Sequence, residues 1–145
     1  MITLILAQQL RDAGLVWRPV PLDFFALADC QMDDDIFVIS DQATFLQLYN
    51  GYPVVAFHGS AEWALDHVYL TDVTWLPSEF QLRQQIERRI TADAPLRLER
   101  IAGGYRCETT FADAPHASEA ADAEAALALV LLALLRADDR PIDDR

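Results

Sequence analysis

Apolar side chains recur at helical spacing in three parts of the chain. In residues 3–13 they follow an i, i+4, i+7 pattern, and Gly14 comes where a helix commonly ends. A second helix is expected to begin at S-x-x-Q, residues 78–81, which matches the capping-box pattern. A third helix is expected to begin at Asp122 as its N-cap and to run to about Arg136, and it is apolar nearly all round. Such a helix is either deeply buried or shared with another subunit.

Elsewhere the pattern indicates β-strands and their turns. Asn50-Gly51 is a strong hairpin signal, because both residues tolerate a positive φ. Gly103-Gly104 is predicted to form the turn of a second hairpin, and residues 112–121 are predicted to form a polar loop. The strands are expected at residues 15–20, 23–28, 36–40, 43–49, 52–58, part of 69–77, 96–102 and 105–111.

The order of these elements predicts an α+β fold. We expect a mostly antiparallel sheet of about five to seven strands, with an N-terminal helix, a middle helix and a buried C-terminal helix. A chain of 145 residues fits one domain, which we assign to residues 1–136. Residues 137–145 are charged and are expected to form a disordered acidic tail.

The charge composition excludes several classes of function. The net charge is −12, and every basic residue is an arginine. Without lysine the chain cannot supply a P-loop lysine or a Schiff-base lysine. An acidic protein is a poor ligand for nucleic acid and for anionic membranes, so neither partner is predicted. Six arginines form a mildly basic island that is expected to be a solvated face with local ion pairs; they are residues 83, 88, 89, 97, 100 and 106.

The compartment is predicted to be the cytoplasm. The longest apolar run, residues 125–135, has eleven residues, whereas a membrane span needs about 20. Residues 1–10 carry no charged side chain, so no signal peptide is expected. Cys30 and Cys107 could form a disulfide, although the alternation around Cys107 favours a buried free thiol.

The segment HGSAEWALDH, residues 58–67, has the most concentrated chemistry. On a functional interpretation, Glu62 and Asp66 share one helix face, and His58 and His67 flank it. Two carboxylates and an imidazole could bind a divalent cation or act as an acid–base pair beside Trp63. On a structural interpretation the segment is a short capped helix that anchors Trp63 in the core.

The remaining motifs do not predict a binding or catalytic site. The triplet at 33–35 lacks the glycine and glutamate of an EF-hand loop, so an acidic turn is expected. His116 is expected to be a surface histidine. Trp75, like Trp63, is expected to be a packing anchor whose indole N–H finds a carbonyl. No G-x-G-x-x-G motif is present, and no cofactor is predicted.

Four segments together resemble a family of small bacterial proteins. They are FVISD at 37–41, AFHGSAEWALD at 56–66, TWLPSEFQLRQQI at 74–86 and DAEAALALVLLALL at 122–135. The family is uncharacterised and is sometimes labelled a pilus-assembly protein. The likeness covers most of the chain, and it implies one small cytoplasmic bacterial domain without a particular activity.

Two functions follow as hypotheses. The first is a small non-enzymatic protein–protein interaction or regulatory module, whose negative charge would steer it to a basic partner. The alternative is a small-molecule or divalent-metal binding domain, or an enzyme, that uses His58, Glu62 and Asp66. Separately, the apolar helix at 122–136 predicts a symmetric homodimer through that helix.

Overall fold

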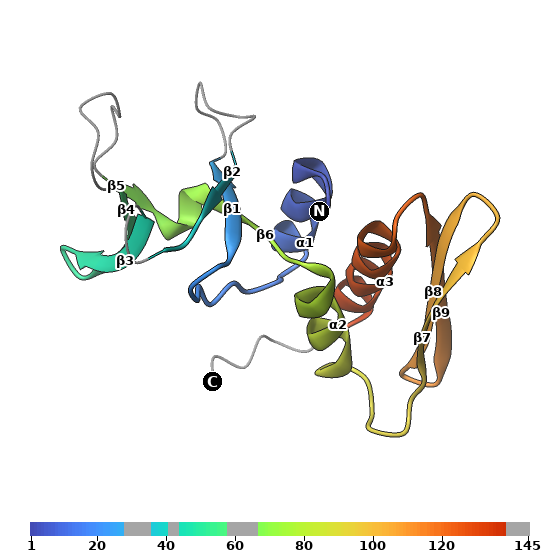
Figure 1. Ribbon diagram of the computed structural model, residues 1–145. Helices are drawn as coiled ribbons and strands as arrows, with labels where there is room; N and C mark the ends of the chain where they lie inside the picture. Colours follow the sequence, from blue (N-terminus) through green and yellow to red (C-terminus); the bar gives the residue numbers. More distant parts are fainter. Residues whose placement is uncertain (28–35, 41–43, 58–66, 139–145) are drawn as a thin grey trace. The chain divides into compact units, whose positions relative to one another are not determined.

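The protein folds into two compact units, as seen in a computed structural model that describes residues 1–27, 36–40, 44–57 and 67–138 (Figure 1). Unit 1 comprises Met1–Val16 and Pro77–Arg145, and unit 2 comprises Trp17–Leu76. The α+β class is confirmed: the described residues hold three α-helices and nine strands. The strands form three separate three-stranded antiparallel sheets, so the expectation of one sheet with five to seven strands is wrong. The single domain over residues 1–136 stays a prediction.

The helices of unit 1 begin at side-chain caps. They are α1 (Leu4–Asp12), α2 (Glu79–Glu87) and α3 (Ala123–Ala137). Thr3, Ser78 and Asp122 each accept a hydrogen bond from a backbone N–H of the first turn. The predicted capping box at Ser78 is present in full. None of the helices in the described residues is long and apolar enough to cross a membrane.

The sheet of unit 1 has the order β7-β8-β9. Its strands are β7 (Leu96–Ile101), β8 (Gly104–Phe111) and β9 (Ala114–Ala120). The β7–β8 turn is Ala102-Gly103, one residue earlier than expected. Gly104 belongs to β8, where an added Cβ would collide with the carbonyl oxygen of Ala120. The close backbone approach, not the turn, therefore explains this glycine.

Strand β9 replaces the polar loop expected at residues 112–121. Ala112 and Asp113 form the two-residue turn before it, and both have positive φ angles, 49° and 61°. Such turns usually contain glycine or asparagine, and APHASEA lacks the β-branched residues typical of a strand. The expected loop was wrong because neither signal is present in the sequence.

Helix α3 forms the centre of unit 1. It packs against α1 and α2 and against strands β8 and β9 of the sheet (Figure 1). Its side chains that are almost wholly buried are Ala126, Leu127, Ala128, Val130, Leu131, Leu132 and Leu134. The same chain covers this apolar surface, which confirms deep burial. A homodimer through α3 stays a prediction, but the argument for it is weaker because the apolar side chains of this helix are already buried.

Unit 2 is built from two small sheets. One has the order β2-β1-β6 and the other the order β3-β4-β5. Buried side chains from both sheets meet in one cluster, which includes Phe25, Val55 and Val73. The strands are β1 (Phe24–Leu27), β2 (Ile36–Val38), β3 (Thr44–Tyr49), β4 (Tyr52–Phe57), β5 (His67–Tyr69) and β6 (Val73–Leu76), with a 3-10 turn at Leu70–Asp72.

A buried carboxylate fixes the segment that leads into β1. Residues 15–20 form no strand, contrary to expectation. Instead, Asp23 is 2% exposed and accepts hydrogen bonds from Trp17 Nε1 (2.8 Å) and from the backbone N–H of Val20 (3.0 Å). Trp17 stacks on Trp75, with ring centroids 6.4 Å apart. The anchoring role of Trp75 is confirmed, but its buried Nε1 finds no acceptor among the described residues, so the expected carbonyl contact is wrong.

Candidate functional site

The site expected from the sequence lies outside the described residues. His58, Glu62, Trp63 and Asp66 all fall in residues 58–66, and the acidic triplet at 33–35 and Cys30 are likewise outside. Their proposed chemistry stays a prediction. Within the part of the chain that the structure describes, no group of three or more His, Cys, Asp or Glu side chains could hold a metal ion.

A group of aromatic side chains lies on one face of the β3-β4-β5 sheet. Tyr49 pairs with Tyr52 across the turn, and β5 brings Tyr69 and His67 beside β4. Because side chains alternate along a strand, the pairing register places these four on the same face. We call this set, Tyr49, Tyr52, His67 and Tyr69, the tyrosine face. Val55 points the opposite way and is fully buried in the core of unit 2.

The rings of the tyrosine face contact one another and remain open to solvent. His67 lies 4.4 Å from Tyr49 and 5.9 Å from Tyr69, measured between ring centroids. Tyr52 meets Tyr69 edge to face at 6.5 Å. Tyr52 is 64% exposed, Tyr49 44% and Tyr69 41%. The mutual contacts restrain the rings, and a restrained aromatic surface loses little side-chain entropy when it is covered.

The segment that supplies two of these tyrosines carries no charge, although unit 2 as a whole is strongly acidic. Unit 2 has nine acidic residues against one arginine, so it carries −8 of the net charge of −12. Residues 42–61 nevertheless contain no Asp, Glu, Lys or Arg, although 23% of the chain is charged. A surface rich in tyrosine and poor in charge has the composition found at the centre of protein interfaces.

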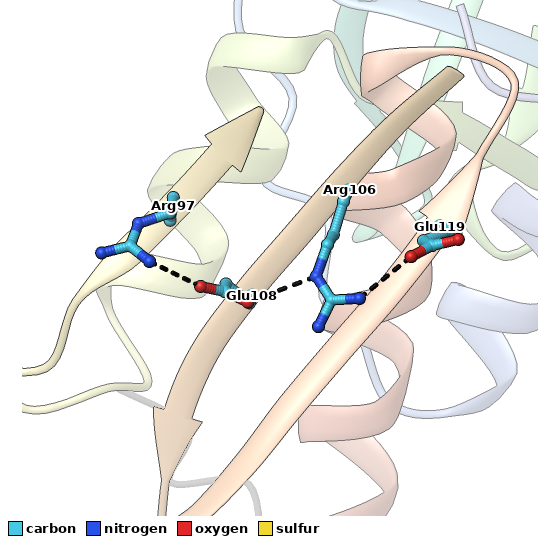
Figure 2. Close-up of polar contacts among 4 residues, drawn as sticks. All are labelled: Arg97, Arg106, Glu108 and Glu119. Atoms are coloured by element: carbon cyan, nitrogen blue, oxygen red, sulfur yellow. Dashed lines mark hydrogen bonds and ion pairs between the residues drawn. The ribbon is translucent and has the colours of Figure 1, made fainter. Parts of the chain in front are cut away.

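Two arginines of the basic island, Arg97 and Arg106, form the local ion pairs that the sequence predicted. Arg97 lies opposite Glu108, and Arg106 lies opposite Glu119 in adjacent strands. Nitrogen–oxygen distances of 2.9, 3.3 and 2.9 Å join them in the order Arg97–Glu108–Arg106–Glu119 (Figure 2). The hydrogen bonds from Arg106 to Glu119 and to Glu108 hold the pKa of Arg106 above its ordinary value. Opposite charges neutralise each other along this ladder, as the expectation of local ion pairs required.

Cys107 and His116 lie on strands β8 and β9 of unit 1. Cys107 is a free and fully buried thiol, and burial raises its pKa to about 11. A thiol with so high a pKa is a poor nucleophile at neutral pH. His116 lies on β9, half-buried, with its ring 6.2 Å from that of Phe111.

Comparison with known proteins suggests no family and no function for this chain. No protein-family model, no curated protein and no solved structure matches this chain. The resemblance to the small bacterial family therefore stays a prediction.

The tyrosine face was missed in the sequence, although one signal was available. The uncharged run at residues 42–61 stands out in a chain with 34 charged side chains. The face itself depends on the pairing of β5 with β4, which brings Tyr69 next to Val54 from fifteen positions away. Local periodicity cannot reveal such a pairing.

Proposed function

We propose that the protein is a protein–protein interaction module and that the tyrosine face contacts its partner. The observation that carries the proposal is the exposure of three tyrosines on one sheet face, two of which lie in a run without charge. Tyrosine supplies a large contact area together with a hydroxyl group, and it is enriched among the residues that dominate binding energy.

The proposed partner presents basic side chains. The net charge of −8 on unit 2 would attract a basic surface over a distance set by the ionic strength. On contact, arginine or lysine side chains can lie over the exposed faces of Tyr52 and Tyr69 as cation–π pairs. Each such pair at an exposed site contributes about 0.5–1 kcal/mol, or about a two- to fivefold change in Kd.

Titration of the full chain with a synthetic arginine-rich peptide tests this function. Calorimetry should detect binding that weakens with added salt, and a glutamate-rich peptide of the same length should not bind. The double variant Tyr52→Ala/Tyr69→Ala should bind the basic peptide roughly five- to thirtyfold more weakly, if the two pairs add.

Phe80 on α2 offers a matched control, because it is an aromatic side chain of unit 1 that is 57% exposed. Phe80→Ala should leave the affinity for the basic peptide unchanged. Equal affinity of wild type and the double tyrosine variant would contradict the role given to the tyrosine face.

A further inference from the structure

We infer that the tyrosine face selects arginine over lysine side chains, because the guanidinium group of arginine can lie flat on the exposed rings of Tyr52 and Tyr69. The inference rests on the proposed function, since it names the basic side chain that the partner presents to this face. The acidic charge of unit 2 attracts arginine and lysine equally at long range, because each carries one positive charge. A preference between them must therefore come from contact with the face itself.

The sheet that carries the tyrosine face has aromatic rings but no acidic residue in its strands. Strands β3, β4 and β5 contain neither aspartate nor glutamate. All nine acidic residues of unit 2 lie outside its six described strands. The carboxylates thus supply attraction at a distance, whereas the strands supply rings for contact.

This composition favours a guanidinium group over an ammonium group. The ammonium group of lysine is compact and strongly hydrated, so covering it on a surface of rings costs hydration that the rings do not replace. The guanidinium group of arginine is planar and more weakly hydrated, and it stacks on aromatic faces. Arginine therefore loses less favourable hydration on this face and makes a larger contact with each ring.

The rings of Tyr52 and Tyr69 have faces open for such stacking. They meet at an interplanar angle of 89° with their centroids 6.5 Å apart. Rings that touch edge to face leave both faces of at least one ring clear of the other ring. The ring of Tyr49 is less available, because it lies 4.4 Å from that of His67 at an interplanar angle of only 31°. Tyr52 and Tyr69, both exposed, are thus the rings on which we expect a guanidinium group to stack.

Unit 1 contains an example of the same contact. The guanidinium carbon of Arg83 lies 5.7 Å from the centroid of the Phe80 ring. A cation within about 6 Å of a ring centroid is attracted to the face of that ring. Phe80 already has an arginine of its own chain over its ring, so it serves as a control position that should not affect the selection.

Calorimetric titration of the full chain with two peptides of equal length and charge, one rich in arginine and one rich in lysine, tests this selection. Wild type and Phe80→Ala should bind the arginine peptide at least about fivefold more tightly than the lysine peptide. The double variant Tyr52→Phe/Tyr69→Phe keeps both rings and should keep most of this preference. Tyr52→Leu/Tyr69→Leu keeps apolar side chains but removes the rings, so it should bind the two peptides with equal affinity.

Each outcome separates the selection of arginine from the proposed function. Equal affinity of wild type for the two peptides would overturn the selection and leave the proposed function in place. An arginine preference that persists in the double leucine variant would also overturn it, because the rings would not be its source. Failure of wild type to bind either peptide would contradict the proposed function, and the inference with it. All substitutions are at exposed positions and should keep the fold, which circular dichroism checks.

Discussion

The hydrogen bonds of Asp23 give the sharpest prediction on how unit 2 is held together. Asp23→Ala removes the acceptor of two donors, the Trp17 indole N–H and the Val20 amide. Asp23 is 2% exposed, so water cannot readily replace the lost acceptor. Leaving a buried donor unsatisfied costs about 1–3 kcal/mol. Both bonds are part-buried and Val20 is 50% exposed, so the variant should lose roughly 2–4 kcal/mol of unfolding free energy.

A double-mutant cycle isolates the bond between the two side chains. Trp17→Phe keeps most of the ring but removes the indole N–H, so the orphaned donor disappears when it is combined with Asp23→Ala. Urea unfolding followed by circular dichroism gives the four free energies, and a coupling of about 1–2 kcal/mol is expected. Asp72→Ala, at an exposed aspartate of the same unit, should change stability by less than about 0.5 kcal/mol. If the effects of Asp23→Ala and Trp17→Phe simply add within about 0.5 kcal/mol, the reasoning is refuted.

Three further predictions concern unit 1. Burial raises the pKa of Cys107 from 9.0 to about 11, so its neutral thiol stabilises the fold fully below pH 9, and that contribution is lost as the pH rises from 9 through about 11. Denaturation at pH 10 should show a loss of about 1.4 kcal/mol relative to pH 7 in wild type, and Cys107→Ala should lack this component. Gly104→Ala should destabilise the protein by about 1–3 kcal/mol or more, because its Cβ would meet the backbone of Ala120. A thermal melt like that of wild type would contradict the close approach. Glu108→Gln removes the acidic centre of the ladder, so the melting temperature of this variant should depend less on salt than that of wild type, and equal salt dependence would count against the ladder.

Local signals in the sequence predicted local structure well. The capping box at Ser78, the cap at Asp122 and the Asn50-Gly51 turn are all present, because each depends on residues only a few positions apart. Gly14, with φ 97°, follows α1 as expected, and the amide of Leu15 donates to the carbonyl of Leu10.

Non-local structure could not be predicted in the same way. The pattern predicted strands without fixing their partners, so three small sheets were taken for one. β9 was missed because its sequence, APHASEA, resembles a polar loop. The tyrosine face depends on both local sequence and non-local pairing. The lack of charge can be read from residues 42–61, whereas the grouping of the aromatic side chains depends on the pairing of β5 with β4.

The central claim, that the tyrosine face binds a basic partner, is tested most directly by affinity capture from a lysate of the protein's own host. Wild type, Tyr52→Ala/Tyr69→Ala and Phe80→Ala should be tagged at full length and used side by side, with the captured proteins identified by mass spectrometry. Wild type and Phe80→Ala should retain one stoichiometric basic protein that is released at high salt, and the double tyrosine variant should not retain it. Equal capture by all three, or capture of no basic protein by wild type, would contradict the claim.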